Sequence, residues 1–248
     1  MSASDGQVAA SPIQRPRATS LRTRSRILEA ARALFNERGT AEVSTNHIAA
    51  AADVSPGNLY YHYADKRDIV RELHAAYSAS HEGRWWPSDD PGQNIVKLRE
   101  NLATGASLAW EYRFLGREVL ALMRADPDLR AAYRAAYERR LGEWLAFGEQ
   151  LVDQGLLRRP RPPRSIGDLT LALWLIEEGW LPFLDATGDP QDPALVARGN
   201  DLVLAVLDPL LTAKGRRAFE AAGIIAAPGG ADGSQATSAR DRLAEHPR

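Results

Sequence analysis

The sequence predicts an all-α protein, and three observations support this fold class. Apolar residues recur at spacings of three and four along most of the chain, whereas alternating strand patterns are missing. Polar capping residues and prolines stand where the periodic segments begin. The 248 residues suffice for a sizeable buried core. Because all six tryptophans lie at or after Trp85, we expect a small helical front unit followed by an aromatic-rich helical body.

Four short helices are expected in the front unit. The first covers roughly Thr23 to Arg38 and stops at Gly39, a residue type that commonly ends helices. The second runs from Thr45 to about Ala51 behind Ser44, whose hydroxyl can accept from free backbone amides. The third opens with Ser55 as N-cap and Pro56 at its first position. The fourth starts after Asp65 and extends to about His81.

Longer helices are expected in the body, after a break at Trp85–Gly92 that holds two prolines. The last of them should be kinked or restarted by Pro209. The predicted segments are Asn94–Glu111, Phe114–Arg124, a helix from Pro127 to about Leu151, Ser165–Asp185 and Pro193–Lys214.

Both ends of the chain consist mostly of small and polar residues, and this composition predicts disorder. Residues 1–21 form a basic arm, and residues 223–248 form a tail rich in glycine, alanine and serine. The arginines from Arg15 to Arg26 either form a solvated arm without function or touch phosphates or a minor groove. The predicted domains between the two ends are 22–66 and 67–222.

Composition excludes several classes of function. With 31 Lys plus Arg against 32 Asp plus Glu, the net charge of −1 excludes global attraction to a polyanion, so any such binding needs a local patch. The absence of cysteine excludes disulfides, thiolate metal sites and cysteine nucleophiles. Neither an apolar run long enough for a membrane span nor a signal-peptide core is present, so we expect a cytoplasmic protein without a membrane partner.

The most specific segment is IAAAADVSPGNLYYHYADK, residues 48–66, in which two helices are joined by a very short link. Ala49 is small enough for close helix crossing, and Asp53 tolerates the positive φ that the turn requires. Ile48, Val54 and Leu59 are apolar at offsets that point inward. The outward residues of the third helix are polar or small, and none is acidic. This pattern predicts a helix-turn-helix whose second helix enters the major groove of DNA.

Individual roles follow from side-chain chemistry. Asn58 can pair bidentately with adenine, while Pro56 and Gly57 allow close approach to a base edge. Tyr60 and His62, together with Thr45, are better placed for phosphates, as is Lys66 at the start of the next helix. The candidate DNA-binding residues are Arg24, Thr45, Ser55, Pro56, Gly57, Asn58, Tyr60, Tyr61, His62 and Lys66.

The segment Thr23–Tyr77 resembles the DNA-binding domain of the tetracycline-repressor (TetR) family, through RILEAARALFNERG, the core IA–AADVS, and LYYHY followed by lysine. Two positions depart from the family pattern: Asp53 replaces a frequent glycine, and Asn58 replaces a common small hydroxyl residue. The resemblance implies an N-terminal three-helix helix-turn-helix DNA-binding domain plus a C-terminal helical ligand-binding and dimerisation domain. It further implies a homodimer formed through about Ser165–Lys214, a palindromic operator in double-stranded DNA, and an inducer enclosed by the central helices.

An aromatic cluster in the body is either ordinary core or the wall of a pocket for an apolar or aromatic inducer. Glu177 and its neighbour Glu178 interrupt an apolar run, so one of them either binds a polar group of the ligand, pairs with an arginine such as Arg113, or lies at the rim of the dimer interface. The candidate ligand-binding residues are His74, Tyr77, Trp110, Phe114, Tyr133, Tyr137, Trp144, Trp174 and Glu177. No cofactor is expected. No metal is expected either, because His74, Tyr77 and His81 share a helix face but lack a further ligand.

The function expected from these features is ligand-responsive transcriptional regulation, most often repression in this family, exerted in the cytoplasm at the nucleoid. Two alternatives stay open. One is an all-helical enzyme or small-molecule carrier with a helix-turn-helix-like segment, although no phosphate loop or nucleophile–base pair is found in the sequence. The other is a constitutive DNA binder without an inducer.

Overall fold

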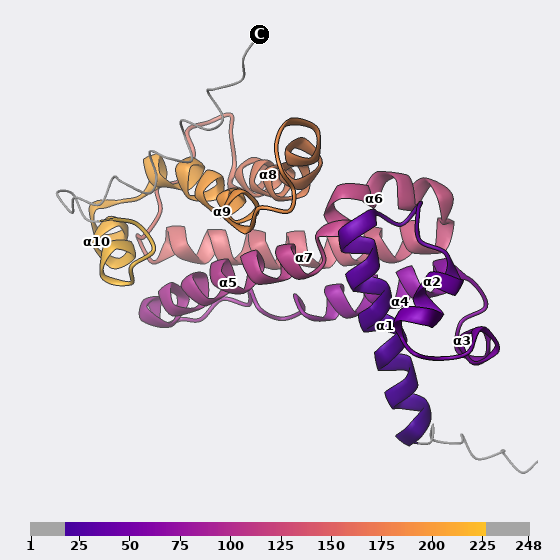
Figure 1. The fold of residues 1–248 in the computed structure, drawn as a ribbon. Coiled ribbons are helices and arrows are strands. Elements are labelled where there is room, and N and C mark those ends of the chain that lie inside the picture. Colours follow the sequence, from indigo (N-terminus) through magenta and orange to yellow (C-terminus); the bar gives the residue numbers. More distant parts are fainter. Residues whose placement is uncertain (1–17, 227–248) are drawn as a thin grey trace, which may run out of the picture.

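The computed structural model describes residues 18–226, which form ten α-helices and no β-strand apart from one isolated bridge between Leu157 and Leu211 (Figure 1). The all-α expectation is therefore confirmed. Four helices form the front unit, which we call the head: α1 (Ala18–Arg38), α2 (Thr45–Ala51), α3 (Pro56–His62) and α4 (Lys66–Ala79). The body comprises α5 (Pro91–Glu111), α6 (Arg113–Ala125), α7 (Pro127–Asp153), α8 (Ile166–Thr187), α9 (Pro193–Leu207) and α10 (Ala213–Ala221).

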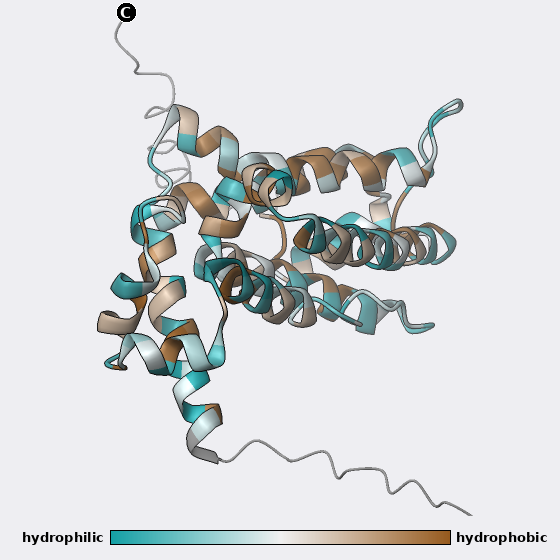
Figure 2. Ribbon diagram, turned by 90° about the vertical axis from the view of Figure 1, so that its right-hand side faces the viewer, coloured by the Kyte–Doolittle hydropathy of each residue, from teal (hydrophilic) through white to brown (hydrophobic). Residues whose placement is uncertain are grey.

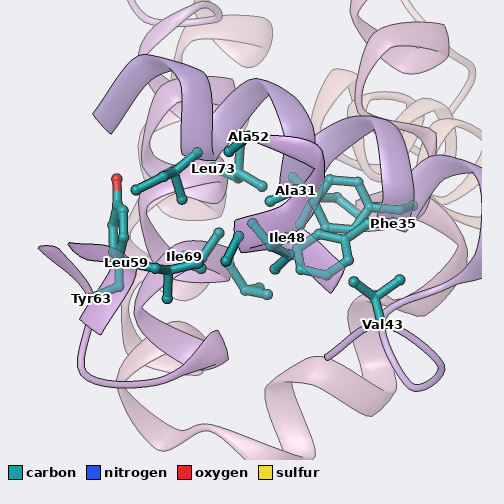
Figure 3. Close-up of a cluster of buried hydrophobic side chains, with 14 of the residues drawn as sticks. Ala31, Phe35, Val43, Ile48, Ala52, Leu59, Tyr63, Ile69 and Leu73 are labelled. Atoms are coloured by element: carbon teal, nitrogen blue, oxygen red, sulfur yellow. The ribbon is translucent and has the colours of Figure 1, made fainter. Parts of the chain in front are cut away.

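One buried cluster holds the head together. Figure 3 shows its side chains converging from α1, α2, α3 and α4, with Phe35, Ile48 and Leu59 fully inaccessible to solvent. Val43 of the connection before α2 completes the cluster on one side. Phe114 of α6 and Leu129 of α7 belong to the same cluster, so the head shares its core with the body.

Hydrogen bonds also join the head to the body at the carboxyl end of α1. The side-chain amide of Asn36 donates to the carbonyl of Glu111 (2.8 Å), and its oxygen accepts from the backbone N–H of Phe114 (3.0 Å). The backbone N–H of Thr40 donates to the Glu118 carboxylate on α6 (3.0 Å). Gln191, between α8 and α9, donates to the carbonyl of Asn36 (2.9 Å). We call this set of contacts the α1–body junction.

The body buries two further apolar clusters. The larger one joins α5, α7, α9 and α10, and the smaller one lies between α8 and α9. The helices α8 and α9, at the top of Figure 1, carry mostly hydrophobic residues, which appear brown in the upper part of Figure 2. Within residues 18–226, no helix combines the length and apolarity needed to cross a membrane.

Several helix boundaries differ from the sequence-based expectations. The first helix begins at Ala18, so residues 18–21, which were assigned to the disordered arm, are helical. The fourth helix ends at Ala79 rather than at about His81. The last predicted helix does not continue to Lys214. It ends at Leu207 and is followed by a 3₁₀ turn that contains Pro209, because proline cannot supply the N–H that a continuing α-helix needs.

The chain then forms α10 as a separate helix, which the sequence did not reveal. Thr212 caps it by accepting from the N–H of Gly215 (2.9 Å), and Phe219 is fully buried against α5. A Cβ added at Gly215 would overlap the carbonyl oxygen of Leu156, so only glycine permits this close packing. Ile224 and Ile225 also pack against the larger body cluster, so the assignment of the tail from residue 223 was wrong at its start. The remaining residues of the predicted arm and tail, 1–17 and 227–248, lie outside the described part of the chain.

Candidate functional site

The turn between α2 and α3 has the geometry that the sequence predicted, and α1 fixes it in place. Asp53 adopts a positive φ of 51°, and the N–H of Val54 donates to the carbonyl of Ala49 (3.0 Å). The guanidinium of Arg26 on α1 donates to the carbonyls of Ala52 (2.6 Å) and Asp53 (2.8 Å), and to the Asp53 carboxylate (3.0 Å). The sequence placed Arg26 only among the arginines that form a solvated arm or contact DNA, because its partners in the turn lie more than twenty residues away.

The outward face of α3 is exposed. Leu59 anchors the helix inward, whereas the side chain of Tyr61 is 80% exposed and that of Tyr60 is 51% exposed. Pro56, Gly57 and Asn58 are also exposed, and a Cβ added at Gly57 would meet nothing within 4 Å. Ser55 caps the helix by accepting from the N–H of Asn58 (3.2 Å). The amino end and outward side of α3 are therefore open to a partner.

Four of the candidate DNA contacts are also tied to neighbours within the head. The hydroxyls of Thr45 and Tyr60 are hydrogen bonded (2.9 Å), which links the start of α2 to α3. The rings of Tyr61 and His62 meet edge to face, with centroids 5.1 Å apart. Burial, and secondarily the charge of Arg24, lowers the pKa of His62, so this imidazole is uncharged at neutral pH.

Lys66 and Arg24, both predicted to contact DNA, have partners within the head. The ammonium of Lys66 donates to the carbonyls of Thr40 and Val43 (2.8 Å for Val43). These carbonyls lie in the connection between α1 and α2, where no helix supplies a partner. The guanidinium of Arg24 pairs with Glu72 on α4 and lies 4.9 Å from the ring centroid of Tyr63. Both cations therefore stabilise the head.

A cavity of about 90 Å³ lies in the body, enclosed by α4, α5, α6, α7, α8 and α9. Six aromatic side chains line it: Tyr77, Tyr112, Tyr133, Tyr137, Trp174 and Trp180. Six of the nine candidate ligand-binding residues contribute to this wall, namely His74, Tyr77, Tyr133, Tyr137, Trp174 and Glu177. We call this space the aromatic cavity.

The other three candidates lie elsewhere. Phe114 is fully buried, with its ring centroid 5.2 Å from that of Phe35, so it belongs to the core shared by head and body. The guanidinium carbon of Arg113 lies over the ring of Trp110, 4.1 Å from the centroid of that ring. Trp144 lines a second, almost wholly apolar cavity of about 70 Å³ between α5, α7, α8 and α9. Helical spacing places each ring on the inner side of its helix but does not tell which space that side faces.

The arginine that faces the glutamates is Arg140 and not Arg113, which instead donates to Gln191 (2.7 Å). Arg140 is only 7% exposed, and its guanidinium carbon lies 4.6 Å from the ring centroid of Trp174. Its position at i+3 from Tyr137 and i+7 from Tyr133 was a sequence signal that it shares their helix face.

Burial controls the protonation of the polar groups in the aromatic cavity. It raises the pKa of Glu177 to about 7, an effect that Arg140 partly offsets. Burial also raises the pKa of Glu178, which accepts a hydrogen bond from the hydroxyl of Tyr133 (2.9 Å). Burial and Arg140 lower the pKa of His74, and they lower that of His81 to about 3. Both imidazoles are therefore uncharged, and Arg140 is the fixed cation of the cavity wall.

Two family models match the chain. One, described as bacterial regulatory proteins of the tetR family, matches residues 27–73, and the other, described as bacterial transcriptional repressor, matches residues 77–219. The regulator AcrR of Shigella flexneri is 36% identical over 83 residues, which are 32% of this chain and 38% of AcrR. The repressor KstR2 of Mycobacterium tuberculosis is 42% identical over 50 residues, which are 20% of this chain and 25% of KstR2. The matches thus span well under half the length of these curated relatives.

Solved structures cover more of the chain. A TetR-family regulator from Marinobacter aquaeolei VT8 has a TM-score of 0.71 and 31% identity, with 82% of this chain and 98% of that chain covered. SmeT in complex with triclosan has a TM-score of 0.52 and 20% identity, with 77% and 92% covered, and so supports the fold alone. Because a family model covers more than half of the chain and the Marinobacter regulator is similar over nearly its whole length, this chain belongs to the TetR family of bacterial transcriptional regulators.

Proposed function

We propose that the protein is a transcriptional repressor that binds a palindromic operator as a homodimer and releases it when a small molecule enters the aromatic cavity. The observation that carries this proposal is the open outward face of α3, which is anchored by Leu59 and bears no acidic residue. An exposed helix without negative charge suits the major groove, whose edges offer acceptors, donors and methyl groups. We propose that it acts in the cytoplasm at the nucleoid, as a regulator and not as an enzyme.

Gly57 allows a direct test of the docking face. A Cβ added at Gly57 meets no neighbour in the protein, and glycine inside a helix costs about 1 kcal/mol relative to alanine, so Gly57→Leu should leave the head folded. The leucine would nevertheless occupy the space that a base edge needs. We expect operator affinity to fall at least tenfold, measured by fluorescence anisotropy on a duplex obtained by in-vitro selection.

Gly142 provides the matched control for this test. It is an exposed glycine inside α7, where an added Cβ also meets nothing within 4 Å, and it lies in the body rather than the head. Gly142→Leu should bind the operator like the unmodified protein. Equal operator affinity of both variants would remove α3 from the DNA interface, and failure to select any duplex at low salt would remove DNA binding altogether.

Exposed apolar side chains on α8 and α9 support the proposed dimer. Leu175 is 62% exposed and Phe183 is 54% exposed, although both are large and apolar. With Leu171 and Gly179 they recur every four residues and therefore share one face of α8. On α9, Val206 is exposed as well. Pairing this face with its copy in a second subunit would bury it. Because α9 ends at Leu207, the proposed interface covers Ile166–Leu207 and does not include α10.

A bound ligand would cause release of DNA through α4, the helix of the head that also lines the cavity. His74 and Tyr77 of α4 contribute to the cavity wall, and α4 packs directly on α1. A ligand that binds better when the two heads are wrongly spaced lowers operator affinity by its differential binding energy. The complex of SmeT with triclosan supports the general proposal that this fold can hold a small molecule.

A further inference from the structure

Glu177 occupies an unusual position, because it lines both the aromatic cavity and the second, apolar cavity. No hydrogen bond or ion pair to its carboxylate is found among residues 18–226, whereas the neighbouring Glu178 accepts from Tyr133. Glu177 is partly buried, and partial burial of a carboxylate without a partner is costly. The missing partner of Glu177 is therefore a hydrogen-bond donor or a cation.

Arg140 does not supply that partner. Its guanidinium carbon lies 4.6 Å from the ring centroid of Trp174 and 5.9 Å from that of Tyr77, and it forms no ion pair with Glu177 or Glu178 in the described part of the chain. One cation facing two carboxylates leaves an excess of negative charge when both are ionised. An anionic ligand would meet this negative charge, whereas a cationic ligand would neutralise it.

The rings around Glu177 suit a cation as well. Trp174 and Tyr137 meet edge to face with centroids 5.1 Å apart, and both line the same cavity as Glu177. Alkylammonium groups are recognised by aromatic walls, because the negative faces of the rings attract the charge while the alkyl surface is buried. A carboxylate without a partner and an aromatic wall therefore occur together in one cavity.

We propose that the aromatic cavity binds an organic cation with an apolar body, whose charged nitrogen lies beside Glu177. This inference rests on the proposed ligand-responsive function and names the chemical class of its ligand. The second cavity adds a requirement of shape, since Glu177 lines it as well. Its wall includes Leu98, Leu102, Phe147, Leu169 and Leu173, so it is suited to an alkyl chain carried by the same ligand.

Three compounds of similar size and shape separate charge from hydrophobicity. They are benzyltrimethylammonium, its uncharged carbon analogue neopentylbenzene, and the anion benzylsulfonate. Binding to the full-length protein without DNA is followed by tryptophan fluorescence, since Trp174 lines the cavity. We expect the cation to bind at least tenfold more tightly than either of the other two. Equal binding of all three, or preference for the anion, would overturn the proposed ligand class.

Glu177→Gln tests the residue itself, because glutamine keeps the shape of the side chain and removes its charge. Affinity for benzyltrimethylammonium should fall at least tenfold, while affinity for neopentylbenzene, which reports an intact cavity, should not change. Glu100→Gln, at an exposed position of α5, is the matched control and should bind all compounds like the unmodified protein. Unchanged cation affinity in Glu177→Gln would refute the role of this carboxylate.

Chain length tests the second cavity. Replacing one methyl group of the probe by ethyl, propyl and butyl groups should raise affinity by about fourfold for each methylene buried. Affinity that does not rise along this series would refute the assignment of the second cavity to the ligand's alkyl chain.

A separate measurement distinguishes failure of this inference from failure of the proposed function. Operator affinity is measured with and without saturating benzyltrimethylammonium. If the cation binds and the operator is retained, the ligand class stands and the ligand-responsive function is refuted. If no cation binds in the fluorescence experiment, the ligand class is refuted whatever the protein does on DNA.

Discussion

Lys66 offers the sharpest test of how the head is built, because its expected phosphate contact and its observed position predict opposite results. In the structure the ammonium donates to the carbonyls of Thr40 and Val43. Lys66→Met keeps most of the apolar stem and removes both hydrogen bonds. A hydrogen bond from a charged donor contributes about 1.5–3 kcal/mol. Because this site is half-buried, we take the lower end for each of the two bonds, so the variant should lose about 3 kcal/mol of stability.

For a protein of this size, that loss corresponds to a decrease of about 5–10 °C in melting temperature, measured by differential scanning calorimetry. Lys97→Met is the matched control, since the ammonium of Lys97 donates to a single exposed carbonyl, that of Trp86 (2.7 Å). It should change stability by less than about 1 kcal/mol.

DNA binding supplies the decisive second measurement. A cation that neutralises one phosphate contributes about 0.9 to the slope of log affinity against log salt concentration. Because the ammonium of Lys66 is occupied within the head, we expect the slope of Lys66→Met to equal that of the unmodified protein. An unchanged melting temperature together with a slope reduced by about 0.9 would show that Lys66 serves the phosphate and would refute its structural role.

Three further predictions concern the operator, the dimer and the cavity. Asn58→Ala should relax preference at one base position per half-site, at a cost of about 1–3 kcal/mol, and an unchanged in-vitro selection profile would exclude a base contact. Leu175→Arg should convert the dimer to a monomer in light scattering, whereas Leu120→Arg, at a 60% exposed position of α6, should not; a dimeric Leu175→Arg would exclude this face. Affinity for benzyltrimethylammonium should rise about tenfold from pH 6 to pH 8, because burial raises the pKa of Glu177 to about 7 and the ionised carboxylate attracts the cation. A flat pH profile would contradict this. The other charged or titratable groups that line the aromatic cavity with Glu177 are His74, Tyr77, His81, Tyr112, Tyr133, Tyr137, Arg140 and Glu178.

Local chemistry made most helix starts predictable. Ser44, Ser55, Asp65, Asp126 and Asp192 each accept from backbone N–H groups in the first turn of the helix that they precede, as their residue types and positions indicated. The separate helix α10 was not predictable in this way. What fixes it is the approach of Gly215 to the backbone of Leu156, a contact between segments almost sixty residues apart.

The candidate site was predictable to the extent that helical periodicity allows. Tyr133 and Tyr137 were correctly placed with Trp174 on a common inner surface, but the same reasoning assigned Phe114 to the cavity, although it packs on Phe35. Periodicity identifies the inner side of a helix and not the element opposite. The partners of charged residues are harder still to predict, since Arg140 meets aromatic rings that come from α4 and α8.

The α1–body junction has a consequence for how the head can move. If α4 were the sole connection, the head could swing about it as about a single hinge. Asn36 and Thr40 add a second attachment, through α6, and the same helix places Gly116 and Val119 in the wall of the aromatic cavity. Two attachments on different helices prevent free rotation, so each head keeps a defined orientation before it meets DNA. Little orientational entropy then remains to be lost on association, and a displacement of α6 by a ligand would turn the head directly instead of merely loosening it.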